Sequence, residues 1–488
     1  MNLKRYGIVW KIVIFFLIFS IGCSKNQNSN TGNGSGNNGG GNGAGSSTTD
    51  IQYWVTRGDQ SLLLAKSKTP ILFAGTFNGN SSITVDSTNQ FQSIDGFGFT
   101  LTDGSATLIN NLNSTDRNSL LKELFGNDSA SISISYLRLS MGASDLSASV
   151  YSYDDMPAGQ TDSTLQNFNL RTDKSDVVAV LKQILVVNPN IKIISTPWSP
   201  PTWMKDNNNS IGGSLLPGYY DSYALYFVKY IQAIANEGIN INAVTPQNEP
   251  LNPSNNPSMY MTAVQEVSFV THHLGPALKA ANLNTKIIVW DHNCDHPEYP
   301  ISILNDATAQ QYIDGSAFHL YAGDISALSQ VHSAFPDKNI YFTEQYTAST
   351  GDFAGDLKWH LKNVIIGSMR NWSRNALEWN LGNDPNYQPH TNGGCTTCKG
   401  AITFAGTITR NVAYYIVAQI SKFVPPGSVR IGSNYITNLY NVAFLRPDGK
   451  KVLVVENDGT TSQSFNIQYN NKWAPVSIDG NTVATFIW

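Results

Sequence analysis

The sequence predicts an α/β protein: a (β/α)8 barrel with a β-sandwich side domain built from the two ends of the chain. Strand-like and helix-like patterns alternate through the middle of the chain, eight strand candidates occur there, and both ends carry strands without helices. Alternation of this kind is typical of a parallel sheet, and eight is the number of strands that closes such a barrel.

The first residues are typical of a targeting segment rather than of a folded body. Lys4 and Arg5 precede an almost wholly apolar run at 8–21, and Cys23 follows shortly after. Residues 1–23 resemble a bacterial lipoprotein signal in which Cys23 becomes lipidated, and a plain secretory signal cut elsewhere is the alternative. Both interpretations predict an extracytoplasmic protein, either secreted or lipid-anchored to a bacterial membrane at the cell surface or on the periplasmic face.

Residues 24–50 consist mainly of Asn, Gly and Ser. Such a segment cannot offset its ordering entropy by burying apolar surface, so it predicts a flexible tether. A tether directly after a lipid anchor would let the folded body stand off from the membrane.

The composition limits the classes of partner. The chain of 488 residues has a net charge of −4 with only 14% charged residues, so it offers no basic surface to nucleic acid, and no nucleic-acid partner is expected. Aromatic residues reach 11%, which suits stacking against the apolar faces of sugar rings.

The two ends of the folded body, 51–93 and 411–488, predict an all-β side domain. Short alternating runs are separated by turn signals such as Pro447-Asp448-Gly449, and no helical pattern lies between them. The candidate strands are 81–86, 435–437, 442–445, 451–456 and 464–467. We expect both segments to form one sandwich.

Between them, residues 94–410 predict the barrel. The candidate strands are 94–101, 135–142, 191–198, 241–249, 286–292, 316–321, 339–346 and 376–381. The clearest helix is 221–235, which carries an apolar stripe. The stripe consists of Tyr223, Phe227, Tyr230, Ile231 and Ile234.

A doubly wound open sheet is the alternative architecture. It requires a glycine-rich phosphate turn after the first strand, and Gly96-Phe97-Gly98 lacks a third glycine that opens a helix. We therefore expect the barrel and no nucleotide cofactor.

Two carboxylates end predicted strands at the same mouth of the barrel. Glu249 follows Asn248 at the end of the fourth strand, where Pro250 stops the ladder, and Glu344 ends the seventh. Active sites of such barrels lie at the carboxyl ends of the strands. Paired carboxylates carry out glycoside hydrolysis: one is protonated to help the leaving oxygen depart, and the other is ionised.

Seven motifs occur in order along the chain. They are Gln92-Ser93-Ile94-Asp95-Gly96-Phe97-Gly98, Thr102-Asp103-Gly104, Leu137-Arg138-Leu139-Ser140, Ser195-Thr196-Pro197-Trp198-Ser199-Pro200-Pro201-Thr202-Trp203-Met204-Lys205, Gln247-Asn248-Glu249-Pro250, Phe342-Thr343-Glu344 and Glu378-Trp379-Asn380-Leu381. Together they resemble glycoside hydrolase family 30, which contains glucosylceramidases and endo-β-1,6-glucanases. The resemblance covers nearly all of the chain beyond the tether.

The resemblance implies that Glu249 is the general acid/base and Glu344 the nucleophile of a retaining mechanism. Retention requires the two carboxyl groups to lie about 5–5.5 Å apart. We expect the pKa of Glu249 to be raised by burial and by the negative charge of Glu344, so that Glu249 is protonated before substrate binds.

The resemblance also implies substrate-binding positions. Arg138 matches an arginine that keeps Glu344 ionised. The positions around the −1 sugar are Asp103 and Trp198 for the far hydroxyls, Asn248 for the 2-OH, Tyr321 beside the nucleophile, Trp379 as the floor and Asn380 as its polar companion. Each has a plainer alternative, because the aromatic residues could belong to the core, Asp103 could begin a helix and Arg138 could pair with any buried acid.

Two further motifs suggest other chemistry. The polar run 291–296 looks like a metal cluster, but its spacing matches no zinc motif, and we expect a polar loop after the fifth strand. Cys395 and Cys398 form a lone CxxC, for which a small loop disulfide near the mouth is expected outside the cytoplasm. We expect no metal and no cofactor.

The predicted function is a retaining hydrolase of β-linked glucosyl bonds, with β-1,6-glucan as the preferred substrate. The runs 247–260 and 289–293 resemble the bacterial β-1,6-glucanases more than the glucosylceramidases. Glucosylceramidase, other β-glucosidase and xylanase-type activities are the alternatives within the family. A non-catalytic glycan-binding surface lipoprotein is the alternative from another class.

Overall fold

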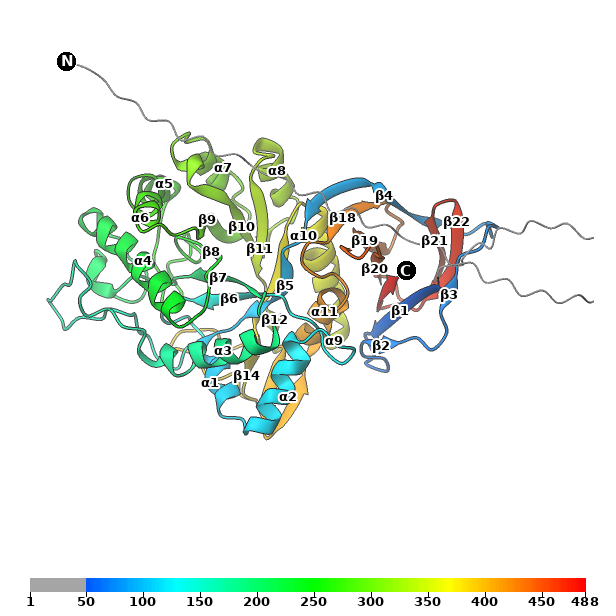
Figure 1. Ribbon diagram of the computed structural model, residues 1–488, viewed down its shortest axis with the longest axis horizontal. Helices are drawn as coiled ribbons and strands as arrows, with labels where there is room; N and C mark the ends of the chain where they lie inside the picture. Colours follow the sequence, from blue (N-terminus) through cyan, green and yellow to red (C-terminus); the bar gives the residue numbers. More distant parts are fainter. Residues whose placement is uncertain (1–49) are drawn as a thin grey trace, which may run out of the picture. The chain divides into compact units, whose positions relative to one another are not determined.

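The computed structural model describes residues 50–488. Residues 1–49, which include the expected signal segment, Cys23 and nearly all of the expected tether, lie outside the described residues. Within 50–488 the chain forms a barrel of parallel strands ringed by helices, and a β-sandwich (Figure 1). None of the helices in that range combines the length and the apolar character that crossing a bilayer requires.

The eight expected barrel strands are all present. They are β5 (Gly96–Thr100), β6 (Tyr136–Ser140), β7 (Lys192–Thr196), β8 (Ala243–Val244), β9 (Lys286–Cys294), β10 (Ile313–Gly323), β11 (Asn339–Glu344) and β13 (Asn375–Asn380). Each pairs in parallel with the next from β5 to β11, and β13 pairs with β5. Between β11 and β13 the ring closes through an isolated parallel bridge from Ile340 to Ser373. The predicted barrel is therefore confirmed.

The interior of the barrel is filled by side chains. Seven of the eight strands each send one buried residue into a common layer, consisting of Tyr136, Ile194, Ala243, Ile288, Ala317, Tyr341 and Leu377. Such a layer makes the interior a packed core, so substrate can be bound only at the mouth.

Helices cover the outside of the barrel. They are α1 (Asp103–Asn110), α2 (Ser114–Phe125), α3 (Val177–Val187), α4 (Tyr220–Asn236), α5 (Ala263–Phe269), α6 (Gly275–Ala280), α7 (Glu298–Leu304), α8 (Ala327–Ala334), α9 (Phe353–Trp359), α10 (Gly367–Arg370) and α11 (Val412–Ser421). The helix expected at 221–235 is confirmed as α4, whose apolar stripe is buried.

Short strands shape the loops after β11 and β13. β12 (Thr347–Ala348) pairs with β15 (Cys398–Lys399), while β14 (Gly382–Asn383), β16 (Ile402–Ala405) and β17 (Thr407–Arg410) form a separate small sheet. These pairings tie the long loop after β13 to the loop after β11.

The side domain joins both ends of the chain, as expected. Its strands are β1 (Asp50–Arg57), β2 (Ala65–Lys66), β3 (Ile71–Leu72), β4 (Ser82–Ser93), β18 (Val429–Ser433), β19 (Leu439–Leu445), β20 (Lys451–Asn457), β21 (Gln463–Tyr469), β22 (Lys472–Ile478) and β23 (Thr482–Ile487). N-terminal β1 pairs with C-terminal β23, and β4 lies between β18 and β21.

One expected strand of the side domain is wrong. At 435–437 the chain turns, and only Ile436 pairs, through a single bridge to Leu439. The strand at this point of the fold is β18, which ends before the turn. Three apolar or β-branched residues in a row are too few to separate a strand from a hairpin turn.

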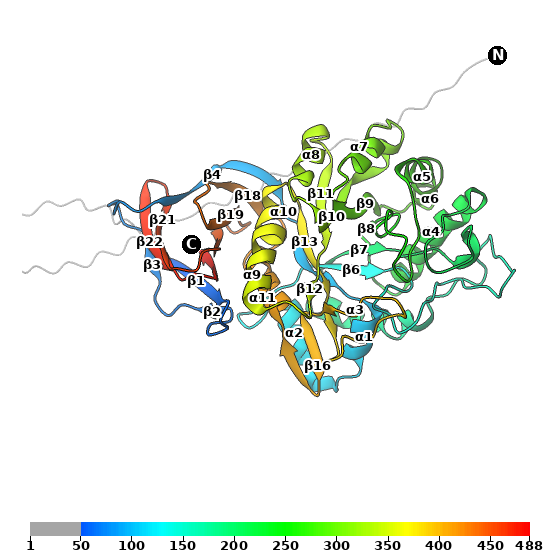
Figure 2. The same cartoon turned by 180° about the vertical axis from the view of Figure 1, so that it is seen from behind.

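Helix α11 lies between the two domains. It contacts β5 of the barrel and β1 and β23 of the sandwich, and α9 and α10 lie beside it (Figure 2). The boundary expected at residue 410 falls immediately before this shared helix.

Arg370 at the end of α10 joins the barrel to the sandwich. Its guanidinium donates to the backbone oxygens of Asn441 and Ser433, and it stacks 4.0 Å from the ring centroid of Tyr435. A charged donor that satisfies two carbonyl oxygens of another domain contributes more than an exposed ion pair does.

We predict that Arg370→Ala lowers the free energy of unfolding by about 3–6 kcal/mol, because it removes two hydrogen bonds from a charged group, which each contribute about 1.5–3 kcal/mol. Urea unfolding followed by tryptophan fluorescence measures the change. Lys122→Ala is the control, since it removes an exposed ion pair with Asp128 and is expected to cost less than about 1 kcal/mol. Equal costs for the two substitutions would contradict a structural role for Arg370.

Candidate active site

A cavity of about 710 Å³ opens at the carboxyl ends of the barrel strands. Glu249, Tyr321, Glu344 and Trp379 line it, as does Asp145 from the loop after β6. Both expected catalytic glutamates therefore face one space, at the mouth where this type of barrel carries its chemistry.

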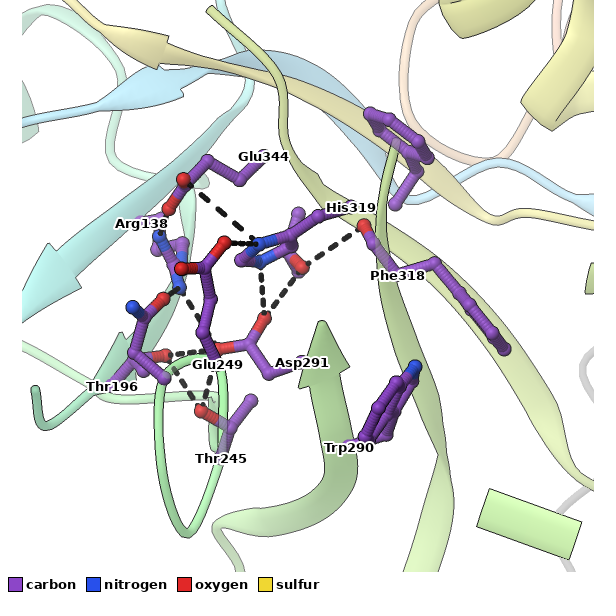
Figure 3. Close-up of polar contacts among 12 residues, drawn as sticks. Arg138, Thr196, Thr245, Glu249, Trp290, Asp291, Phe318, His319 and Glu344 are labelled. Carbon is purple, nitrogen blue, oxygen red and sulfur yellow. Dashed lines mark hydrogen bonds and ion pairs between the residues drawn. The ribbon is translucent and has the colours of Figure 1, made fainter. Parts of the chain in front are cut away.

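The two glutamates approach each other around His319 (Figure 3). The Nδ1 atom of His319 lies 3.1 Å from Oε1 of Glu249 and 3.9 Å from Oε1 of Glu344. One oxygen of each carboxylate and a ring nitrogen of His319 lie within 4.8 Å of one another. The side chain of His319 is fully buried.

Glu344 is held by two donors from other strands. Nη1 of Arg138 lies 2.5 Å from its Oε2, and the hydroxyl of Tyr321 donates to its Oε1 at 2.9 Å. These bonds fix the orientation of the carboxylate. The Oε1 atom lies beside Tyr321 and His319, within the cavity.

Asp291 lies beneath the glutamates and is fully buried. Its partners come from five other strands or the residues directly after them: Nη2 of Arg138 at 2.9 Å, Oγ1 of Thr196 at 3.2 Å, Oγ1 of Thr245 at 2.8 Å, Nε2 of His319 at 3.2 Å and Oγ1 of Thr343 at 2.6 Å. The polar loop expected at 291–296 is therefore wrong at its start, because β9 continues to Cys294 and carries Asp291 into the floor of the site.

The backbone is strained where Asp291 turns inward. Trp290 and Asp291 have φ values of 78° and 54°, and the pairing of β9 with β10 skips Asp291. Glu249 also has a positive φ, 46°, and its N–H donates to the carbonyl of Asp291 at 3.0 Å. Left-handed conformations are unfavourable for side chains of this size and cluster at functional sites. Here they bring the carboxylates of Glu249 and Asp291 to opposite ring nitrogens of His319.

Protonation in the site differs from our expectation. Burial acts to raise the pKa of Glu249, but the hydrogen bond and charge of His319, with the donor Asn252, lower it to about 2. Burial raises the pKa of Glu344 against the charges of His319 and Arg138. The expected raised pKa of Glu249 is therefore wrong for this geometry, because the imidazole of His319, which lies 70 residues away in the chain, contacts its carboxylate.

The two expected tryptophans form a stacked pair. Trp198 and Trp379 have ring centroids 5.2 Å apart, and the guanidinium of Arg138 lies 4.8 Å from the ring of Trp198. Trp379 lines the cavity, whereas Trp198 is buried behind it. The pair thus offers one aromatic face to a ligand and uses the other ring to hold Arg138.

Asn248 is oriented by the same arginine. Its Oδ1 accepts from Nη2 of Arg138 at 2.6 Å, which leaves Nδ2 without a hydrogen-bond partner among residues 50–488. The amide therefore has a donor available beside Glu249.

Of the expected sugar-binding residues, Tyr321 and Trp379 line the cavity, whereas Trp198, Asn248, Asp103 and Asn380 do not. Asp103 is the first residue of α1 and accepts from the hydroxyl of Ser147 at 2.6 Å. Asn380 lies 2.9 Å from Oγ of Ser105, also on α1. The structure places Asp145 in the cavity instead, with burial and the charges of Glu344 and Glu249 raising its pKa to about 7.

Asp145, Asp291 and His319 were not among the expected site residues. His319 had a usable signal, since it precedes Tyr321 by two positions on one strand and so shares its face. Asp145 lies in a loop seven residues after Arg138, and nothing in its local sequence separates it from a turn residue. Asp291 opens a polar run, a pattern that predicts a loop rather than a buried strand residue.

Cys395 and Cys398 form a disulfide in the loop after β13. Both sulfur-bearing residues line the cavity, and the N–H of Cys395 lies 3.3 Å from Oδ2 of Asp145. The disulfide therefore forms part of the wall next to a buried acid.

Glu249, His319 and Glu344 are the one set within the described range that could present three metal ligands together. Each already has protein partners, and the guanidinium of Arg138 beside Glu344 would repel a cation. The arrangement suits proton transfer and nucleophilic attack on a sugar better than metal binding.

Known proteins share this architecture. A model described as the glycosyl hydrolase family 30 TIM-barrel domain matches residues 94–424, and the beta sandwich domain of the same family matches residues 427–486. The endo-1,6-beta-D-glucanase neg1 of Aspergillus fumigatus is 37% identical over 426 residues, which cover 81% of this chain and 85% of that protein. Putative glucosylceramidase 4 of Caenorhabditis elegans is 30% identical over 450 residues, covering 84% and 83%.

A solved structure is similar over nearly its whole length. The endo-beta1,6-glucanase BT3312 superposes with a TM-score of 0.84 at 34% sequence identity, and the match covers 90% of this chain and 99% of that one.

We predict that Asp291→Asn lowers the free energy of unfolding by about 3–5 kcal/mol at neutral pH, because it breaks a fully buried ion pair with Arg138. Burial opposes ionisation, but Arg138 and His319 hold the pKa of Asp291 well below its usual range. The stabilising contribution is complete above the unfolded pKa of about 3.9 and shrinks as pH falls below it. Urea unfolding at several pH values should therefore show that the difference in free energy of unfolding between the wild type and Asp291→Asn becomes smaller below about pH 4.

Asp221→Asn is the matched control, because Asp221 pairs with His273 while its own side chain is 90% exposed. The same substitution there should change stability by less than about 1 kcal/mol. If the difference in free energy of unfolding between the wild type and Asp291→Asn did not change with pH, the carboxylate of Asp291 would not be ionised in the folded protein.

Proposed function

Because the chain belongs to glycosyl hydrolase family 30, we propose that it is a retaining endo-β-1,6-glucanase with Glu249 as acid/base and Glu344 as nucleophile. The approach of the two carboxylates, with one oxygen of each within 4.8 Å of the other, is the observation that carries the proposal. Retaining glycosidases hold these groups about 5–5.5 Å apart, whereas inverting enzymes leave about 6.5–9.5 Å for a water. The spacing supports direct attack on the sugar.

In the first step Oε1 of Glu344 attacks the anomeric carbon while Glu249 protonates the departing glycosidic oxygen. The bonds from Arg138 and Tyr321 hold the carboxylate of Glu344 in its orientation and favour its ionised form. The product is a covalent glycosyl-enzyme. In the second step Glu249 takes a proton from water, the water attacks the anomeric carbon, and Glu344 leaves, which restores the original configuration.

The neighbouring residues hold the −1 sugar. Nδ2 of Asn248 is placed to donate to the 2-OH, a bond that strengthens as the ring flattens. Trp379 forms the floor, and Asp145 is available to the far hydroxyls. We assign Trp198, Asn380 and Asp103 to support behind this surface, because Trp198 stacks on Trp379 and the polar atoms of Asn380 and Asp103 are bonded to Ser105 and Ser147.

The outer wall of the cavity favours a glycan over a lipid. Beyond Glu249 it is lined mainly by polar residues: Asn252, Ser254, Asn255, His292, Asn293, Asp295 and His296. Such a wall can hydrogen-bond a second sugar, whereas the ceramide of a glucosylceramide requires apolar contact. Three relatives at 36–37% identity are named endo-1,6-beta-D-glucanases, which supports the β-1,6 linkage.

Two other functions make different predictions. A glucosylceramidase would share the glutamates but needs an apolar aglycone site. A non-catalytic glycan-binding lipoprotein has no need for a nucleophile fixed by both Arg138 and Tyr321, so the ordered contacts of Glu344 favour the enzyme.

We also propose that the enzyme acts outside the cytoplasm, anchored through an acyl group on Cys23. The motif at 1–23 and the disulfide between Cys395 and Cys398 support this location, since disulfides persist in oxidising compartments.

We predict that Glu249→Gln lowers kcat/KM on β-1,6-glucan by about 10²–10⁴-fold, the usual contribution of a general acid, and that Glu344→Gln abolishes hydrolysis. Product sizes from β-1,3-, β-1,4- and β-1,6-glucans, xylan and glucosylceramide measure the linkage preference. NMR of the first product should show the β anomer.

Glu378→Gln is the control for both variants, because Glu378 is also a buried glutamate on a barrel strand, β13, but it bonds to His360 and does not line the cavity. It should retain activity on β-1,6-glucan. An α anomer would refute the role of Glu344, and a wild type that binds glucan without cleaving it would favour the binding protein.

We predict that a radiolabelled fatty acid is incorporated into the wild type and not into Cys23→Ala when both are expressed in a bacterial host. The label should partition with the membrane fraction. Retention of the label by Cys23→Ala would rule out this anchor, and Cys294→Ala, which removes a buried free cysteine, controls for loss of a thiol elsewhere.

A further inference from the structure

His319 occupies the centre of the charge network and touches no solvent (Figure 3). Its Nε2 lies 3.2 Å from Oδ1 of Asp291, and its Nδ1 lies 3.1 Å from Oε1 of Glu249. The ring therefore connects the buried acid in the floor to the catalytic acid in the cavity.

The groups around His319 fix how it can titrate. The titratable side chains in contact with its ring are Glu249 from the loop after β8, Asp291 and His292 from β9, Tyr321 from β10 and Glu344 from β11. Beyond them, Arg138 from β6 binds both Asp291 and Glu344, and Asp145 from the loop after β6 lines the cavity with Glu249 and Glu344. Carboxylates outnumber cations in this set, which favours a proton on the imidazole.

The two ring nitrogens have different roles. Asp291 stays ionised because Arg138 and three threonine hydroxyls bind it, so Nε2 keeps its hydrogen and donates to Asp291. The remaining proton is shared between Nδ1 of His319 and Oε1 of Glu249. A charged imidazolium–carboxylate pair and a neutral imidazole–carboxylic acid pair differ only in the position of this proton.

The charged pair is favoured before substrate binds. Burial acts to lower the pKa of His319, but the charge of Glu344 and the hydrogen bonds to Asp291 and Glu249 raise it to about 9. The pKa of Glu249 is lowered to about 2 in the same surroundings. Glu249 thus faces the cavity as a carboxylate, although its chemistry in the first step requires an acid.

We propose that His319 stores the catalytic proton on Nδ1 and passes it to Oε1 of Glu249 when a glucan occupies the cleft. This rests on the proposed function. Substrate displaces water from around Glu249, and a buried ion pair loses more solvation than the neutral pair does. Once on Oε1 the proton can turn from Nδ1 toward the glycosidic oxygen, which accepts a hydrogen bond only from the protonated acid, and this favours the transfer further.

The proton is conserved over the cycle. It moves from Nδ1 to Glu249, and then to the leaving oxygen as the glycosyl-enzyme forms, leaving a neutral imidazole and a carboxylate. The attacking water then gives a proton to Glu249, and that proton returns to Nδ1 as Glu344 regains its charge. His319 touches no reacting atom, so it is a positioning residue that acts through Glu249.

The variant His319→Asn tests the proposal, because its amide can still bond Glu249 from the position of Nδ1 but cannot store a proton. Two substrates are compared: a β-1,6-linked gluco-oligosaccharide, whose leaving sugar needs protonation, and dinitrophenyl β-gentiobioside, whose leaving group departs as an anion. We expect kcat/KM to fall about 10²-fold on the first and less than about threefold on the second. The alkaline limb of the pH profile on the oligosaccharide should move to lower pH by at least one unit, because Glu249 alone then holds the proton.

His360→Asn is the matched control, since His360 is another buried histidine whose Nδ1 contacts a glutamate, Glu378, at 2.7 Å behind the site. This control should leave unchanged both the ratio of kcat/KM on the two substrates and the alkaline limb of the pH profile on the oligosaccharide. Equal losses on both substrates for His319→Asn, or an unmoved alkaline limb, would overturn the proposal. A wild type that cleaves neither substrate would refute the proposed function instead.

If His319→Asn does not fold, a measurement on the wild type can test whether Nδ1 of His319 carries the proton. The chain has eight histidines, and ¹⁵N-histidine NMR resolves the protonation of each ring nitrogen. We expect Nδ1 of His319 to be protonated at pH 7 without ligand and unprotonated with a non-hydrolysable S-linked β-1,6 disaccharide bound. An unprotonated Nδ1 in the unliganded enzyme would contradict storage of the proton on His319.

Discussion

The arrangement of the active site depends on the hydrogen bonds and ion pair of one buried carboxylate, that of Asp291. Removing a carboxylate from water costs several kcal/mol, and this cost is offset only when charge and hydrogen bonds surround it. Here Arg138, Thr196, Thr245, His319 and Thr343 supply them. Because these partners come from β6, β7, β10 and β11 and from the residue after β8, one ion holds the mouth ends of most of the barrel in register.

The same carboxylate explains where the strained backbone lies. Asp291 reaches the barrel axis only because β9 bulges at Trp290 and Asp291, and its carbonyl then accepts the N–H of Glu249, itself at positive φ. Strain of this kind persists where surrounding contacts over-determine it. The position of Glu249 and the orientation of Arg138, and through Arg138 that of Glu344, all follow from one buried group.

The sequence was sufficient for the elements whose signals are local or repeated. The eight strands follow from alternation, and Glu249 and Glu344 follow from carboxylates at strand ends within family motifs. The position of Asp145 depends on the path of a loop, and the burial of Asp291 depends on a bulge, which no periodicity shows. Asp103 and Asn380 carry the right chemistry in the right motif, but α1 holds both outside the cavity. The protonation of Glu249 could not be predicted without the contact with His319, whose partners are 70 and 28 residues away.

A retaining glycosidase must use one carboxylate as an acid and then as a base, and in the mechanism that we propose the charge of Glu344 links these two roles of Glu249. That charge is the largest attraction raising the pKa of His319. When Glu344 becomes an ester its charge disappears, the imidazole binds a proton less tightly, and Glu249 stands as a carboxylate beside a neutral ring, ready to take a proton from water. When water releases the sugar, the charge on Glu344 returns and draws the proton back to Nδ1. In the proposed mechanism, the bond from Glu344 to the sugar therefore sets the protonation of Glu249 through the imidazole between them.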